Sequence, residues 1–172
     1  MLLCAARLTV GITVRRGGSL PAPRPGQLKP MMGNQTINCV LLADRHHGLT
    51  EGVRGLLETA FDAVVMVADE TSLLESAERI KPTLAIVDLS LVRGESLQWL
   101  PRLRARSPDM KLILLSVHDQ PSVCRAALEA GADAFVLKRA IATDLLPAID
   151  AVQAGHSFVS PGGREQPPSS RD

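Results

Sequence analysis

The sequence predicts an α/β fold, a doubly wound parallel sheet of five strands in the order 2-1-3-4-5. Apolar strand-like runs alternate with segments of helical periodicity at intervals of about twenty residues. Such alternation favours parallel strands, right-handed crossovers and helices on both faces. Two runs also end on an acid, Asp44 and Asp88. In the order 2-1-3-4-5 the first and third strands are neighbours, so these acids should lie side by side.

The predicted strands are short runs rich in aliphatic and β-branched residues. They span residues 37–43, 63–67, 83–88, 110–116 and 134–137. The third run has no polar alternation and therefore indicates a strand that is buried on both faces. Its last residue, Asp88, should reach the edge where open α/β sheets bind their ligands.

The predicted helices are segments whose apolar residues recur at helical spacing. They lie within residues 49–60, 73–80, 97–103, 123–130 and 145–152. Pro82 and Pro108 should end the second and third helices, because the residue before a proline avoids the helical conformation. Gly131 and Gly155 should end the last two, and Gly131 suits the left-handed cap conformation. Trp99 is expected to pack against the sheet.

A chain of 172 residues with 45% hydrophobic composition suits one domain with tails. We expect the domain at residues 37–160, a disordered leader at 1–36 and a disordered tail at 161–172. The leader carries five basic residues, no acid, and a Pro/Gly-rich run that should form neither helices nor strand ladders. Met31 or Met32, just upstream of the domain, is a candidate translation start.

Composition argues against several classes of protein. Residues 37–156 hold 12 basic and 16 acidic groups, which is a poor electrostatic match for nucleic acid. The three cysteines are an odd number without a C-x-x-C spacing, which speaks against a disulfide framework or a zinc knuckle. No apolar run approaches the roughly 20 residues of a membrane span, and the opening is a poor secretory signal. We therefore expect a cytoplasmic protein with no membrane contact.

Four polar residues follow or end the strands of the predicted sheet: Asp44, Asp88, Ser116 and Lys138. Parallel strands bring their carboxyl ends to one edge, so these side chains should meet in one crevice. Two close carboxylates repel each other unless a hard divalent metal or a fixed basic side chain lies between them. A hydroxyl and an ammonium opposite them suit the transfer of a phosphoryl group to a carboxylate.

Around these residues the chain resembles the receiver domain of two-component response regulators, most closely the LuxR-type subfamily. The resemblance covers about residues 37–160 and is carried by the segments VLLADRHH, AIVDLSL, LILLSVHD, EAGADAFVLKRA and AIDAVQAGHSFVSP. It implies a flavodoxin-like (βα)5 fold and a signalling module without enzymatic turnover. It also implies that a sensor histidine kinase is the partner that supplies the phosphoryl group.

The resemblance assigns a role to each matching position. Asp88 would be the phosphoacceptor, and Asp44, Asp88 and the backbone carbonyl of Ser90 would hold magnesium. The phosphate-binding and switch positions fall on Ser116, Lys138 and Phe135, where Phe replaces the commoner Tyr. Ser90 and His118 occupy positions that tune dephosphorylation in the family.

The sequence departs from the family pattern in two places. Arg45 stands where the family has a second acid, which should weaken magnesium binding. It either pairs with Asp44 or Asp88 in place of the missing cation, or faces solvent at the start of a helix. Val92 replaces a proline four residues after Asp88 and should loosen that loop.

We expect output through protein contacts, with a homodimer through the helix 123–130, strand 134–137 and helix 145–152 as a hypothesis. Only a short segment follows residue 160, so we expect no DNA binding by this chain. The alternative function is a phosphorylation-independent receiver that acts as an interaction module.

Two further alternatives rest on weaker patterns. A cobalamin-binding domain would need D-x-H-x-x-G, but Leu49 holds the glycine position. An enzyme with Asp44, His46 and Ser116 as a triad lacks a nucleophile elbow. The adjacent His46 and His47 resemble solvated residues at a helix start more than metal ligands.

Overall fold

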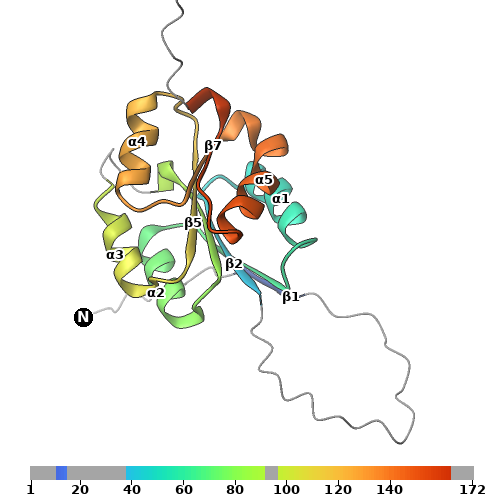
Figure 1. Cartoon of the computed structure of the whole chain (residues 1–172). Helices are drawn as coiled ribbons and strands as arrows, with labels where there is room; N and C mark the ends of the chain where they lie inside the picture. The colour runs from blue at the N-terminus through green and yellow to red at the C-terminus, as the bar shows by residue number, and fades with distance from the viewer. Residues whose placement is uncertain (1–10, 15–37, 92–96, 164–172) are drawn as a thin grey trace, which may run out of the picture.

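The structure is a computed structural model that describes residues 11–14, 38–91 and 97–163. Within them, one seven-stranded sheet is flanked by helices on both faces (Figure 1). The strands are β1 (Gly11–Val14), β2 (Cys39–Ala43), β3 (Ala63–Val67), β4 (Leu84–Asp88), β5 (Lys111–Ser116), β6 (Ala134–Leu137) and β7 (Phe158–Val159). The helices are α1 (His47–Leu57), α2 (Glu70–Ile80), α3 (Trp99–Arg106), α4 (Pro121–Glu129) and α5 (Ile141–Gln153). Three short 3-10 helices are η1 (Leu89–Leu91), η2 (Lys138–Ala140) and η3 (Pro161–Gly163).

The predicted α/β class and strand order are confirmed. The strands run β1-β3-β2-β4-β5-β6-β7 across the sheet, and β2 to β6 are the five predicted strands in the order 2-1-3-4-5. All neighbouring pairs from β3 to β7 are parallel. The sheet therefore has one edge at which all the parallel strands end.

Two strands extend the sheet beyond the prediction. β1 pairs antiparallel with β3, so the expectation of a disordered leader at residues 1–36 is wrong for Gly11–Val14. An edge strand presents unpaired backbone groups, and β1 satisfies those of β3. At the other side β7 pairs with β6, and η3 follows it, so Pro161–Gly163 are not a disordered tail. The remaining residues of the predicted leader and tail lie outside the described residues.

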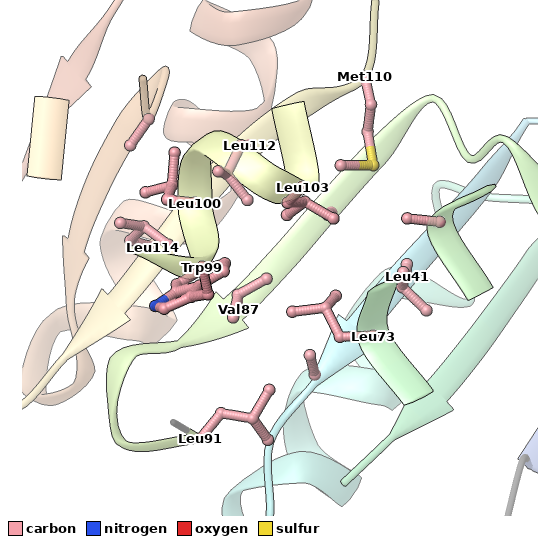
Figure 2. Packing of buried hydrophobic residues seen from close by; sticks show 14 of the residues in the cluster. Leu41, Leu73, Val87, Leu91, Trp99, Leu100, Leu103, Met110, Leu112 and Leu114 are labelled. Carbon is pink, nitrogen blue, oxygen red and sulfur yellow. The ribbon is translucent and has the colours of Figure 1, made fainter. Parts of the chain in front are cut away.

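Alternating side chains of β2 to β6 supply two separate cores. Inward residues of α2, α3 and α4 pack on one face of the sheet, and those of α1 and α5 pack on the other. In β4, for example, Ala85 and Val87 face the first core while Leu84 and Ile86 face the second. Figure 2 shows the first core, where Trp99 lies beside Val87 and is 2% exposed, as expected. A sheet that is buried on both faces explains the continuous apolar runs of its strands.

Local signals end the helices close to their predicted positions. α2 begins after Asp69, whose side chain accepts a hydrogen bond from Ser72 N at 2.8 Å, and it ends before Pro82. Lys81, between the helix and that proline, has φ of 51° and is the only described non-glycine residue with positive φ. Gly131, with φ of 108°, has the positive φ expected of it after α4.

The remaining sequence expectations concern cysteines and membranes. Cys39 and Cys124 are buried free thiols, and burial raises the pKa of each. Among the described helices, none is both long and apolar enough to cross a bilayer.

Candidate functional site

Two buried carboxylates lie side by side at the carboxyl edge of the sheet. Asp88 ends β4, and Asp44 follows Ala43, the residue of β2 that pairs with Val87. The register therefore brings both acids to the same level on adjacent strands. Asp44 is 5% exposed and Asp88 is 2% exposed. Buried acids need partners, because removing an unpaired charge from water is costly.

Lys138 is the basic partner of both acids. It begins η2 directly after β6, and its side chain is 12% exposed. Its Nζ lies 2.7 Å from Asp88 Oδ2 and 3.2 Å from Asp44 Oδ2. Two carboxylates and one ammonium leave this cluster with a net negative charge when all three groups are ionised.

Asp88 also accepts hydrogen bonds from its own loop. The backbone N–H of Ser90, in η1, donates to Asp88 Oδ1 at 3.0 Å, and Ser90 Oγ donates to Asp88 Oδ2. Burial by itself raises the pKa of Asp88, but the hydrogen bonds from Lys138 and Ser90 and the charge of Lys138 outweigh it. The net effect is a lowered pKa, so Asp88 is ionised at neutral pH.

Ser116 ends β5 and is 1% exposed. Its Oγ accepts a hydrogen bond from His118 N at 2.9 Å and donates to His118 O at 3.2 Å. The hydroxyl is therefore held by the turn that follows its own strand. His118 contributes its backbone to this contact and is itself exposed.

Phe135 lies in β6 and is fully buried. The segment after β7 covers it: Ser160 N donates to Phe135 O at 2.9 Å, and a Cβ built on Gly163 would lie 3.6 Å from Phe135 Cδ1. Ser160 Oγ also accepts a hydrogen bond from Leu137 N at 3.0 Å and donates to Asp144 Oδ2 at 2.6 Å. The aromatic side chain thus lies between the sheet and the end of the described chain.

His46 belongs to this site, although its position next to His47 favoured a solvated residue. Its Nδ1 lies 3.2 Å from Asp44 Oδ1 and 3.5 Å from Asp88 Oδ2, and its N–H donates to Asp44 Oδ1 at 2.8 Å. The side chain is 60% exposed, so it covers the acids from the solvent side. Its position two residues after Asp44 is the only signal in the sequence that points to this contact.

Arg45 lies apart from the acids. It is exposed and makes no ion pair with Asp44 or Asp88, all three of which the structure describes. Of the two interpretations of Arg45, the structure therefore has the solvent-facing one. Val92, the other departure from the family pattern, lies outside the described residues.

The side chains at this edge fit a divalent cation in part. Asp44 and Asp88 supply the carboxylate oxygens that hard cations prefer. Where the family has a further acid, this chain has the exposed Arg45, and among the described residues the imidazole of His46 lies close to both carboxylates. One ligand atom from each of Asp44, His46 and Asp88 can be chosen so that all lie within 4.8 Å of one another.

Curated relatives are regulators that contain a similar segment. The nitrate/nitrite response regulator protein NarL of Escherichia coli strain K12 is 32% identical over 131 residues, covering 75% of this chain and 61% of that protein. The transcriptional regulatory protein DegU of Brevibacillus brevis is 28% identical over 124 residues, covering 71% of this chain and 52% of that protein. The chain thus spans between half and two thirds of the length of these relatives.

Solved structures agree with the fold and the family. The isolated receiver domain of RcsB from Salmonella enterica serovar Typhimurium, solved with the phosphomimetic BeF3-, superposes with a TM-score of 0.65 at 26% identity. That match covers 74% of this chain and 96% of the RcsB domain. The family described as the response regulator receiver domain matches residues 40–150. The chain therefore belongs to the response regulator receiver domains of two-component systems, and its relatives are LuxR-family regulators.

Proposed function

We propose that this domain accepts a phosphoryl group on Asp88 from a sensor histidine kinase and passes the signal on through protein contacts. The observation that carries the proposal is Lys138, whose Nζ lies 2.7 Å from Asp88 Oδ2 and 3.2 Å from Asp44 Oδ2. A buried lysine at this place pairs with the Asp88 carboxylate and would also reach a phosphoryl group attached to it. Receivers of this family are signalling modules, and we expect no enzymatic turnover here.

Asp88 is suited to act as the nucleophile. Its lowered pKa keeps the carboxylate ionised at neutral pH, and an ionised oxygen is needed to attack phosphorus. In the transfer from a phosphohistidine, a new bond forms between an Asp88 oxygen and phosphorus, and the phosphorus–nitrogen bond breaks. The electron pair of the broken bond remains on the donor imidazole, and the product is an acyl phosphate on Asp88.

Lys138 and Ser116 would bind the transferred group. The Lys138 ammonium can follow negative charge from the Asp88 carboxylate to a phosphoryl oxygen with little movement. Ser116 would donate its hydroxyl hydrogen to another phosphoryl oxygen, which requires it to leave the carbonyl of His118. Phe135, which is buried on β6 beside β7, would change its position in response to that movement. These roles for Ser116, Lys138 and Phe135 are part of the proposal.

A divalent cation held by Asp44, Asp88 and the carbonyl of Ser90 would neutralise charge on the transferring oxygens. Receivers generally use magnesium at an acidic pocket. In this chain Arg45 supplies no ligand, so magnesium binding should be weak. The chain's own contribution is to keep Asp44 and Asp88 buried and level beside Lys138, with Asp88 ionised.

Output would run through the face formed by α4, β6 and α5. That face carries an exposed ion pair between Arg139 and Asp119, at 2.9 Å, and the partly exposed Leu146. The edge of β6 that faces away from β5 is paired with β7. A second copy of the chain would therefore contact α4, α5 and β7 instead of β6 itself. Light scattering of the phosphorylated form would test this; a monomer at high concentration would count against the homodimer.

The test of phosphorylation is intact mass after incubation with a small-molecule phosphodonor, with and without magnesium. We expect an adduct of one phosphoryl group on the wild-type chain and none on Asp88→Asn. Asp109→Asn is the matched control, because Asp109 is exposed and precedes β5 at the opposite end of the sheet, so its variant should keep the adduct.

The same measurement tests the alternative function, a receiver that acts as an interaction module without phosphorylation. Asp44 and Asp88 already have Lys138 and His46 beside them, and Arg45 removes a metal ligand; these features favour a domain that works without phosphorylation. The absence of any adduct, with folded protein and with each divalent cation, would make the phosphorylation-independent interaction module the leading account.

A further inference from the structure

We infer that His46 is a further protein ligand of the divalent cation at this site, beside Asp44, Asp88 and the carbonyl of Ser90, and that the site consequently prefers a first-row transition metal to magnesium. The inference rests on the proposed function only in placing a cation between Asp44 and Asp88. It differs from the family pattern, in which the additional side-chain ligand is the acid that Arg45 replaces.

The positions of the three ligand atoms carry the inference. His46 Nδ1 lies 3.2 Å from Asp44 Oδ1 and 3.5 Å from Asp88 Oδ2. Bonds of about 2.0–2.2 Å to one ion place neighbouring ligand atoms about 2.8–3.6 Å apart, with octahedral geometry at the short end and tetrahedral geometry at the long end. The imidazole nitrogen is therefore already at ligand separation from one oxygen of each acid.

The backbone holds His46 in this place. Residue 46 precedes α1 and has an extended conformation, with φ of −100° and ψ of 96°. Its N–H donates to Asp44 Oδ1 at 2.8 Å, which ties the main chain of residue 46 to the first acid. The ring is thus positioned over the acids by the same turn that sends Arg45 into solvent.

The type of donor determines which metal is favoured. Magnesium prefers six oxygen ligands in near-ideal octahedral geometry and gains little from an imidazole. Zinc, cobalt, nickel and ferrous iron accept imidazole readily together with carboxylates. Two carboxylates and one imidazole therefore favour a borderline transition-metal ion over magnesium.

Charge does not oppose a dication at this site. With Asp44 and Asp88 ionised and Lys138 protonated, the cluster carries one negative charge, and Lys138 pairs with the Oδ2 atom of each acid. Asp44 Oδ1 remains on the side of His46, and Asp88 Oδ2 would be shared with Lys138. The exposed Arg45 repels every dication alike, so it lowers each affinity without changing the ratio between metals.

The test is titration of the folded full chain with Co²⁺ and with Mg²⁺, without phosphodonor, by calorimetry and by the visible absorption of Co²⁺. We expect Co²⁺ to bind more tightly than Mg²⁺, with an absorption band that reports nitrogen in its coordination shell. His46→Ala should lower the Co²⁺ affinity by at least about 10-fold and shift the band, whereas Mg²⁺ affinity should change little.

Two further variants make the result specific. His156→Ala removes an exposed histidine after α5 and should leave the Co²⁺ affinity and the band unchanged. Asp44→Asn should weaken both metals, because both use the carboxylate. Unchanged Co²⁺ binding in His46→Ala, or equal losses for Co²⁺ and Mg²⁺, would overturn the inference, as would a failure of the wild-type chain to bind Co²⁺.

The outcome is separable from that of the phosphorylation experiment. Co²⁺ binding that depends on His46, together with no phosphoryl adduct, would support the metal site and count against the proposed function. An adduct that forms with Mg²⁺ alone, together with Co²⁺ binding that ignores His46, would support the function and overturn this inference.

Discussion

The two ends of the sheet both hold partly or fully buried charged groups, but they use them differently. At the carboxyl end, Asp44 and Asp88 are held chiefly by side chains that reach in from loops, Lys138 and His46. At the amino end, the guanidinium of Arg104 donates to the backbone carbonyls of Gly131 and Met110 and to Asp133.

The two ends differ in whether the bonding partners of their charged groups can be replaced. Arg104 bonds to chain segments that lead into β5 and β6, and Asp133 Oδ2 accepts from Leu112 N at 2.8 Å, so these bonds fix the start of both strands. Lys138 bonds to carboxylates whose partners can be replaced by a cation or a phosphoryl group. The charge of Arg104, which binds backbone, therefore stabilises the fold, whereas the charge of Lys138, which binds side chains, can take part in ligand binding.

The largest expected effect is at the amino end. Arg104→Ala removes the hydrogen bonds that a partly buried guanidinium donates, so two backbone carbonyls and Asp133 lose their donor. This should lower the unfolding free energy by about 2–4 kcal/mol. Urea unfolding measures it. Arg106→Ala is the control, because its ion pair with Glu78 is exposed and should contribute less than about 0.5 kcal/mol. Equal losses in the two variants would contradict a structural role for Arg104.

The next effect is at the carboxyl end and depends on pH. Lys138→Met leaves two buried carboxylates without their ammonium partner and should cost about 1–3 kcal/mol at pH 7. The pKa of Asp88 is lowered below 3.8 in the folded state, so the stability it contributes is present above that pH and is lost as the pH falls through the lowered value.

In Lys138→Met the largest remaining influence on Asp88 is burial, which raises its pKa. The gap in stability between wild type and variant should therefore narrow as the pH falls from the raised pKa of Asp88 in the variant towards its lowered pKa in the wild type. Urea unfolding at pH 7 and at pH 3.5 measures the gap. Arg139→Ala, which loses only the exposed pair with Asp119, should show no such pH dependence, and a constant gap for Lys138→Met would refute the account.

A third change adds a carboxylate to the carboxyl end. Arg45→Asp restores an acid beside Asp44 and removes a repelling charge, so Mg²⁺ affinity should rise at least about 10-fold. Calorimetry measures it, and Arg45→Ala separates the lost repulsion from the gained ligand. An affinity no higher in Arg45→Asp than in Arg45→Ala would mean that the new carboxylate does not reach the ion.

The smallest expected effect concerns backbone strain at the amino end. Lys81 adopts the left-handed conformation, with φ of 51°, between α2 and Pro82. Lys81→Gly removes the steric cost of the Cβ and should stabilise the domain by about 0.5 kcal/mol, since part of the gain is lost to the greater freedom of glycine in the unfolded chain. Lys81→Ala keeps the Cβ and should gain nothing; a similar gain from alanine in thermal unfolding would argue against strain.

Much of the fold was predictable because short-range patterns determine it. Continuous apolar runs identified the strands, helical spacing identified the helices, and the alternation of the two fixed the sheet order. The same reasoning placed Asp44 and Asp88 together, since the register of parallel strands brings equivalent positions level. Only β1 and β7 were missed, because a pairing partner at a sheet edge is not visible in so short a segment.

The site was predictable only where strands deliver its residues. His46 reaches the acids through the turn between β2 and α1, and the conformation of a turn cannot be read from its residue types. Arg104 resembled other exposed arginines of α3, and its contacts with Gly131 and Met110 depend on the packing of distant segments. Ser160 carried no signal beyond the family resemblance, although it is fully buried.

The pairing of β7 with β6 ties residues 158–163 to the sheet. Ser160 binds the backbone on both sides of Val136, and Gly163 lies against the ring of Phe135. These residues therefore have little freedom to move independently of β6. A displacement of Phe135 would have to displace this segment as well, or be resisted by it.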